Sequence, residues 1–286
     1  MFAFSTPEPV ALRIKTQAGS AHVTAADRGD TTVEVRPSNP SSDADVEHAA
    51  NTIVEQRGGE IAVIAPDVRR FGRTPSIAIS VALPRGSDVA AVAASAEVRL
   101  SGDVGRADLT TASGDVSIEH AAEALVSVAS GEVACERVDG RLAVRSASGN
   151  VRFTTAGTAE ITTASGDASG RAVHGDLEVR TASGDTIIDW VDGSVSGRSA
   201  SGDVRIGAVR QGTVELNSAS GDLRIGVATG SAAWLDVRSI SGDVSSSLEE
   251  SGPPDDGAEV VSIHARTLTG DITILRAATT SNQEQR

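Results

Sequence analysis

The residues of this chain that could do chemistry at a regular spacing are aspartates, each preceded by Ser-Gly. Residues 181–188 read TASGDTII, and close variants of this phrase occur at 111–118 and 218–225. A repeating fold would bring such carboxylates together, and a bound calcium ion could relieve their mutual repulsion. The aspartates considered for a calcium site are Asp167, Asp185, Asp203 and Asp222.

The same phrase also suits a structural corner. Glycine allows a positive φ, and an aspartate side chain can accept hydrogen bonds from nearby backbone N–H groups. Calcium-binding β-rolls repeat Gly-Gly-x-Gly-x-Asp twice per turn, whereas Ser-Gly-Asp occurs here once per repeat, with Glu132 and Asn150 in two of the aspartate positions. We therefore favour structural corners over a metal site, at Ser113, Gly114, Asp115, Ser183, Gly184, Asp185, Ser201, Gly202 and Asp203.

The other reactive residue types form no catalytic pattern. The chain contains no G-x-S-x-G nucleophile elbow, phosphate-binding loop or dinucleotide fingerprint. Its single cysteine, Cys135, falls at an inward apolar position, so we expect a buried, inert thiol and no intrachain disulfide. No two histidines stand at metal-ligand spacing; they are His22, His48, His120, His174 and His264. We expect no catalytic residue and no cofactor.

Short strands must position these residues. Aligned on its serine, the phrase recurs every 17–19 residues from Ser95 to Ser220, and then after 21 and 28 residues. Apolar residues alternate on both sides of it, which marks strands with one buried face. They stand six and four residues before the serine and three and five after it. That odd step of seven cannot keep one face of a flat strand buried, so the chain must bend at the phrase.

These features predict an all-β fold. We expect a single-chain β-solenoid of about ten turns with repeats of about 18 residues, in which each strand pairs with its equivalent one repeat along. An N-terminal β-rich segment with one short helix would cap it. The predicted domains are a cap at 1–90, a solenoid at 91–276 and a disordered tail at 277–286.

Local signals refine the cap. Ser42 would cap a helix over residues 43–51, a hairpin would turn at Gly58-Gly59, and residues 76–84 would form a strand. The stretch TQAGSAHVTA at 16–25 could be a degenerate corner of the same kind. Residues 249–258 are expected to be a loop inserted in the last turn.

The composition narrows the classes of partner. The formal net charge of −14 disfavours binding to nucleic acids and anionic membranes, and an aromatic content of 2% leaves few rings to stack bases. We expect an unknown protein or cell-surface partner, no nucleic acid and no membrane insertion. The N-terminus lacks the basic and apolar regions of a signal peptide, so a cytoplasmic location is the default expectation and a surface location is unsupported.

The repeated phrase from Ser95 to Thr269, together with PVALRIKTQAGSAHVTAADRGDTTVEVRP and RGGEIAVIAP near the N-terminus, resembles a bacterial family of unknown function. Its members are β-strand-repeat proteins that are often labelled "putative adhesin". The resemblance covers nearly the whole chain. It implies a β-solenoid and no established enzymatic activity, and it supplies no catalytic residue to carry over.

Three hypotheses about function remain open. The first is a non-enzymatic β-solenoid that acts as a scaffold or protein-interaction module. The second is a calcium- or glycan-dependent surface adhesin. The third is a polysaccharide-active enzyme, which would need a deep groove with two carboxylates about 5–9 Å apart.

Overall fold

The structure is a computed structural model that describes residues 1–67, 74–249 and 259–277. It is all-β apart from helix α1, and it divides into two compact units, Met1–Thr154 and Thr155–Arg286. The chain passes from unit 1 to unit 2 inside strand β10 (Val151–Ser165). The predicted cap boundary at residue 90 falls inside strand β7. The predicted loop at 249–258 and tail at 277–286 lie, except for their first residues, outside the described residues.

The strands have these bounds. Unit 1 contains β1 (Phe2–Ser5), β2 (Ala11–Ala26), β3 (Asp30–Pro37), α1 (Asp43–Ala50), β4 (Ile53–Arg57), β5 (Glu60–Ile64), β6 (Ile77–Pro84), β7 (Asp88–Ser113), β8 (Val116–Ser130) and β9 (Val133–Ser148). Unit 2 contains β11 (Ala168–Val173), β12 (Leu177–Ser183), β13 (Thr186–Val191), β14 (Val195–Ser201), β15 (Val204–Val209), β16 (Gly212–Ser220), β17 (Leu223–Val227), β18 (Ala232–Ser241), β19 (Val244–Ser246), β20 (Val260–Thr269) and β21 (Ile272–Arg276).

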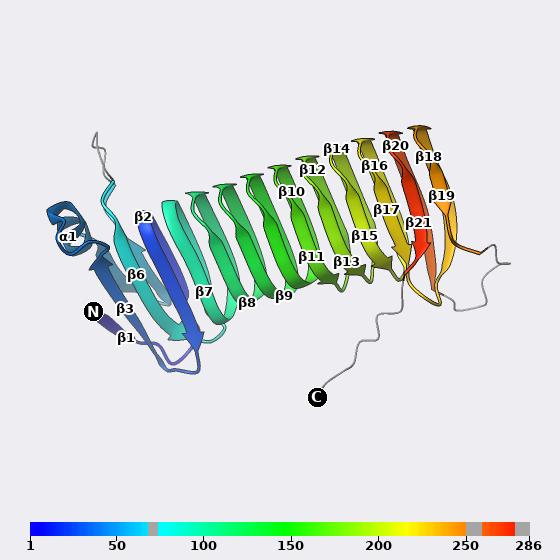
Figure 1. The fold of residues 1–286 in the computed structure, drawn as a ribbon. Helices are drawn as coiled ribbons and strands as arrows, with labels where there is room; N and C mark the ends of the chain where they lie inside the picture. Colours follow the sequence, from blue (N-terminus) through cyan, green and yellow to red (C-terminus); the bar gives the residue numbers. More distant parts are fainter. Residues whose placement is uncertain (68–73, 250–258, 278–286) are drawn as a thin grey trace. The chain divides into compact units, whose positions relative to one another are not determined.

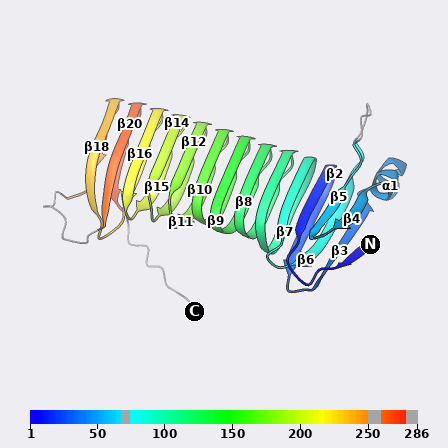
Figure 2. The ribbon, with the colours of Figure 1, turned by 180° about the vertical axis from the view of Figure 1, so that it is seen from behind.

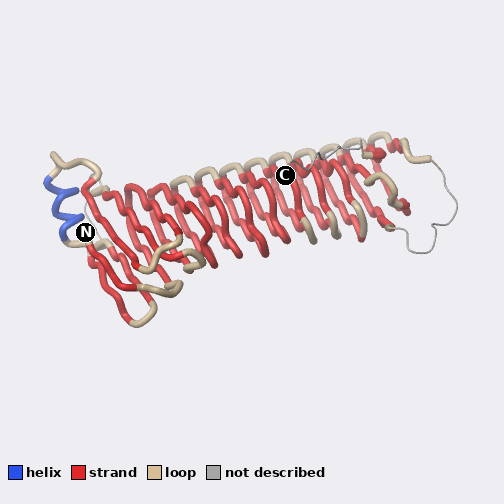
Figure 3. Tube along the Cα trace, turned by 90° about the horizontal axis from the view of Figure 1, so that it is seen from below, coloured by secondary structure: helices blue, strands red, loops and turns tan. Residues whose placement is uncertain are grey.

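The repeating element in each unit is a coil with two parallel-paired segments, one before the Ser-Gly-Asp corner and one after it. Equivalent residues of neighbouring coils lie side by side: Val116 beside Val133 in unit 1, and Leu177 beside Val195 in unit 2. In Figure 3 the corner loops of unit 2 follow one another along one edge of the strands. The solenoid-like parallel sheet predicted from the alternation is confirmed.

The corners require glycine for two reasons. Gly184 and Gly202 have φ values of +128° and +121°, a region that residues with a side chain rarely adopt. A Cβ atom on Gly202 would also lie 2.2 Å from the carbonyl oxygen of Gly184 in the neighbouring coil. The bend deduced from the odd apolar spacing is therefore built by the glycine of each phrase.

The core consists of thin aliphatic layers. Inward residues such as Ile118, Leu142, Ile188 and Ile225 are fully buried, and each stacks on its equivalent in the neighbouring coil. Burial of small β-branched side chains in this way explains how the chain folds with an aromatic content of 2%.

The coils of unit 2 do not follow the order of the sequence, which corrects our expectation that each strand pairs one repeat along. Strands β16 and β17 pair with β20 and β21, whose other edges pair with β18 and β19. The last coil in sequence thus lies between the two coils that precede it, an order visible in both Figure 1 and Figure 2. Residues 228–231 connect β17 to β18 and leave one coil position open between them, which β20 and β21 later fill.

Unit 1 has a similar inversion at its N-terminal end. Strand β2 forms a whole coil, with β7 along one edge and with β5 and β6 along the other, all parallel. Its corner is Gly19, with a φ of +118°, so the degenerate corner predicted at 16–25 is present. Strands β3 and β4 then pair antiparallel with β6 and β5, and β1 pairs antiparallel with β3. These antiparallel strands cover the parallel edge that β5 and β6 would otherwise expose.

The local predictions near the N-terminus are confirmed. Helix α1 begins after Ser42, whose hydroxyl accepts a hydrogen bond from the backbone N–H of Asp45 at 3.3 Å. The buried Asp45 carboxylate in turn accepts from the backbone N–H groups of Asn39 and Ser76, both at 3.2 Å. Strands β4 and β5 form the hairpin around Gly58-Gly59.

Candidate functional site

The aspartates of the repeated phrase form a ladder of hydrogen bonds at the corners. In unit 2, Asp167 Oδ1 accepts from the backbone N–H of Asp185 at 2.9 Å, and Asp185 Oδ1 accepts from that of Asp203 at 2.9 Å. The ladder continues through Asp222 and Asp271 to Asp243, with N···O distances of 2.8 Å. It follows the spatial order of the coils, since Asp271 precedes Asp243.

The structure thus places the four calcium candidates on successive coils. One oxygen of each carboxylate is engaged by a backbone donor, as is Asp115 Oδ1 in unit 1, which accepts from the backbone N–H of Glu132 at 2.9 Å. Within residues 1–67, 74–249 and 259–277, no group of three or more His, Cys, Asp or Glu side chains is arranged to hold a metal ion.

A cluster of alternating charge in unit 1 was missed by the sequence analysis. The His120 ring lies between two carboxylates of neighbouring coils, with Nδ1 2.5 Å from Asp103 Oδ1 and Nε2 2.9 Å from Asp139 Oδ2. Arg85 and Arg137 flank these carboxylates at 2.9 and 2.7 Å. The signal was present as sequence separations of 17 and 19 residues, about one repeat on each side of the histidine.

The cluster shifts the acidities of its members. The hydrogen bond that His120 donates to Asp103, opposed by partial burial and supported by Asp139, raises the pKa of His120 above its ordinary 6.5. The His120 hydrogen bond lowers the pKa of Asp103 below 3.8, and hydrogen bonds from Arg137 and His120 do the same for the pKa of Asp139. No hydroxyl or thiol nucleophile takes part in these contacts, so the arrangement is that of an ion-pair chain.

We predict that this cluster stabilises unit 1 mainly between about pH 4 and pH 6.5. A histidine whose pKa is raised on folding stabilises the fold at pH values below its pKa in the unfolded chain. This contribution is lost as the pH rises through its pKa in the folded chain. The two aspartates stabilise the fold at pH values above their unfolded pKa of 3.8, and their contribution is lost as the pH falls through their lowered pKa values in the folded chain. The urea midpoint of His120→Gln should fall furthest below wild type in this window, and the gap should close as the pH rises through the raised pKa of His120. His22→Gln, at an exposed position of β2, is the matched control for the loss of an imidazole.

A second charged group lies at a corner of unit 2. Trp190 Nε1 donates a hydrogen bond to Asp192 Oδ1 at 2.9 Å, and Arg210 Nε lies 2.8 Å from the same oxygen. His174 Nδ1 is 3.3 Å from Asp192 Oδ2. The tryptophan is half-buried and tied to the corner, which leaves its ring poorly placed as a platform for a sugar.

Cys135 is buried in unit 1, with 3% of its surface exposed, and burial raises the pKa of its thiol to about 12. We predict no reaction with Ellman's reagent in native buffer at pH 8, because the reagent needs an accessible thiolate. One thiol per chain should react after denaturation in urea. Complete labelling of the native protein within minutes would show that this coil opens far more readily than its packing implies.

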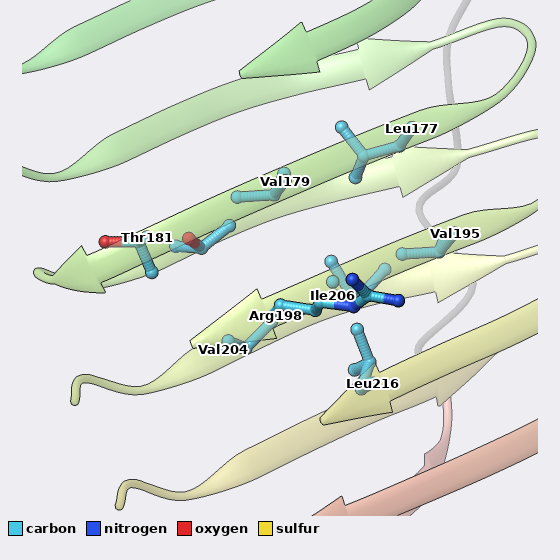
Figure 4. Close-up of a pocket in the computed structure, with 10 residues that line it drawn as sticks. Leu177, Val179, Thr181, Val195, Arg198, Val204, Ile206 and Leu216 are labelled. Carbon is cyan, nitrogen blue, oxygen red and sulfur yellow. The ribbon is translucent and has the colours of Figure 1, made fainter. Parts of the chain in front are cut away.

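A small internal cavity lies in unit 2 where Gly197 interrupts the apolar layers. Figure 4 shows Val179, Ile206 and Leu216 among the side chains around it. Its volume of about 10 Å³ admits at most one water molecule, whereas ligand pockets usually measure about 300–1,000 Å³. This cavity therefore offers no room for a substrate.

Unit 2 has a regular face of polar side chains, which we call the polar face. It consists of outward residues on the paired strands β12, β14, β16, β20 and β18. In spatial order they are Glu178 and Arg180, Ser196 and Arg198, Glu215 and Asn217, His264 and Arg266, and Asp236 and Arg238.

The register aligns the polar face into two rows. Arg180 lies beside Arg198, and Arg238 beside Arg266, with Asn217 between these two pairs. These arginines form the basic row. The other row, which contains Glu178, Glu215 and Asp236, is mainly acidic. It neutralises part of the basic row, because Arg180 pairs with Glu178 and Arg266 lies 3.6 Å from Asp236. The result is an ordered array of charge on a mainly aliphatic inner layer.

No helix among the described residues has the length and apolar character needed to cross a membrane.

Several solved structures and one family model are similar to the chain. No curated protein matches the chain. Among solved structures, a "putative adhesin" from Bacteroides fragilis aligns over 96% of this chain and 95% of its own, with 13% identity and a TM-score of 0.38. A "putative adhesin" from Parabacteroides distasonis aligns over 96% and 95%, with 12% identity and a TM-score of 0.37. A "putative lipid binding protein" from the same species aligns over 97% and 96%, with 11% identity and a TM-score of 0.27.

Likenesses with TM-scores this low support no inference about the function of this chain. The family comparison is more specific. The model described as Toastrack DUF4097 matches residues 38–174 and 168–275, which together make up more than half of the chain. This match confirms the resemblance to a bacterial β-strand-repeat family of unknown function. The chain belongs to the Toastrack DUF4097 family.

Proposed function

We propose that the protein is a non-enzymatic β-solenoid scaffold, of about ten turns of about 18 residues, that binds a protein partner along the polar face. The observation that carries this proposal is the register of the polar face. Parallel pairing repeats each position about every 4.8 Å, so the basic row offers donors at regular spacing on rigid strands. Such a row suits an extended acidic segment of a partner, because guanidinium groups form bidentate hydrogen bonds with carboxylates.

The test compares three tagged full-length chains expressed in the native host. Arg180→Glu/Arg198→Glu reverses two neighbouring charges of the basic row, whereas Arg13→Glu/Arg57→Glu makes the same charge change at exposed positions of unit 1. A partner that copurifies with wild type and the unit 1 variant, but not with the face variant, would support the proposal. The same partners on all three chains would contradict it. Fractionation of the same cells would test the expected cytoplasmic location.

We further propose that the repeated Ser-Gly-Asp phrases are structural turns and hold no calcium. The Asp203 carboxylate accepts a hydrogen bond from the backbone N–H of Asp222, at 2.8 Å, and so takes the place of a backbone acceptor in the neighbouring coil. Asp203→Asn keeps an acceptor oxygen and should change stability little, whereas Asp203→Ala removes the acceptor and should cost about 1 kcal/mol. If calcium were held by the column, Asp203→Asn would be the costly change as well, and a chelator would lower the melting temperature of the wild type.

A further inference from the structure

Strand β18 forms an open edge in unit 2. It pairs with β20 along one side, and β19 pairs with β21 in the same way. Within the described part of the chain no strand pairs with their other sides. The backbone N–H and C=O groups on that side are therefore available to a further strand.

The open edge also carries the largest exposed apolar side chains of unit 2. Trp234 is 71% exposed and Ile240 is 68% exposed, both on the outward face of β18. The inward residues Leu235 and Val237 are only half-buried, whereas their neighbours Ile263 and Ala265 in β20 are fully buried. Among the described residues, the coil at this end thus has no covering layer on its outer side, unlike the inner coils.

The outward residues of β18 are complementary to themselves when the strand is reversed. In order they are Trp234, Asp236, Arg238 and Ile240, spaced evenly about Val237. An antiparallel pair related by a two-fold axis at Val237 places Asp236 opposite Arg238 of the second copy. It also places Trp234 opposite Ile240 of the second copy, and each of these pairs occurs twice. Opposite charges and aromatic–aliphatic pairs directly across antiparallel strands are both stabilising.

Neighbouring registers lack this match. A two-fold axis at Asp236 would set that carboxylate against its own copy, and an axis at Arg238 would do the same for the guanidinium. In the single chain Arg238 lies beside Arg266, and among the described residues it makes no ion pair. Of these registers, only the one centred on Val237 places a carboxylate, Asp236 of the second copy, opposite Arg238.

We infer that β18 is a self-association edge, through which two copies of this chain form an antiparallel, two-fold symmetric pair centred on Val237. The pairing satisfies the open backbone groups and covers Trp234. Because the same patch is used by both copies, the contact is isologous and stops at a dimer. Asp236 and Arg238 also belong to the polar face, but the self-association uses the strand edge and is measured on the pure protein, so its test does not depend on the proposed partner binding.

Sedimentation velocity of the purified full-length chain tests the inference. Wild type should show a concentration-dependent monomer–dimer equilibrium. Asp236→Arg and Arg238→Asp each place like charges opposite one another twice, and each should raise the dissociation constant at least about tenfold. An equimolar mixture of these two variants should dimerise again, because one chain then carries two basic and the other two acidic residues on the strand. The chain with both substitutions should also recover.

Two controls keep the outcome interpretable. Arg198→Glu changes a charge on the polar face away from the edge and should leave the equilibrium unchanged. Trp190→Phe leaves Trp234 as the only tryptophan, and its emission should shift to the blue as the concentration rises. A chain that stays monomeric at all concentrations would overturn the inference, as would a dimer that is insensitive to both edge variants. Matching circular dichroism spectra would exclude misfolding as the cause of any loss.

Discussion

Gly202→Ala lowers the free energy of unfolding by about 3 kcal/mol, among the largest losses expected from any single methyl group in this chain. The methyl group would lie 2.2 Å from the carbonyl oxygen and 2.7 Å from the carbonyl carbon of Gly184. Both are backbone atoms of the neighbouring coil, so relief of the contact requires the coils to separate. The φ of +121° adds strain, because alanine rarely adopts that conformation.

The matched control is Ser201→Ala, one residue earlier in the same corner and exposed. Its urea midpoint should stay close to that of wild type. Gly59→Ala is a second control, because no atom lies within 4 Å of the added methyl group. A Gly202→Ala chain as stable as these two controls would mean that the corner is looser than the contact distance indicates.

Ile263→Ala in β20 should cost about 3 kcal/mol, whereas Leu235→Ala in β18 should cost about 1 kcal/mol or less. Ile263 is 0% exposed because β20 has a neighbour on each side, while Leu235 is half-buried in the end coil. The two positions are equivalent within their coils and lie side by side. The comparison therefore isolates the effect of coil order.

Urea unfolding at low protein concentration, where self-association is weak, measures both changes. Coils stacked in sequence order would reverse the ranking, because Leu235 would then be covered on both sides and Ile263 would lie in the end coil. Equal losses would show that the end coil of unit 2 is covered by something else in solution.

The repeat and its corners could be predicted from the sequence because they depend on short-range chemistry. The alternation of apolar and polar residues indicated which face of each strand is buried. The separation of seven residues between the apolar positions on either side of Ser-Gly-Asp required the bend that Gly184 and Gly202 provide. The helix after Ser42 followed from a local capping preference, and the hairpin at Gly58-Gly59 from turn chemistry.

The order of coils at the ends could not be predicted in this way. Every coil presents nearly the same aliphatic layer, so the pattern does not say which neighbour a strand takes. The spacings of 21 and 28 residues after Ser220 were the only trace, since the chain needs extra length to step over one coil position and to return.

The charged groups were missed for a related reason. His120 meets Asp103 and Asp139 only through the register of neighbouring coils, and no motif in a linear reading joins residues 17 and 19 positions apart. The rows of the polar face depend on the same register, so they too became visible only once the strand pairs were known.

The inserted position of β20 and β21 has a consequence for synthesis on the ribosome. Residues 232–246 leave the exit tunnel first, yet the strands on which they dock are made later. Strands β18 and β19 therefore stay unpaired until β20 and β21 have emerged, the last residue of which is Arg276. Asp271 must then close a loop of 49 residues onto Asp222, where an ordinary coil closes 18. Loop entropy makes that closure costlier by about 1 kcal/mol. We expect this end of unit 2 to form last.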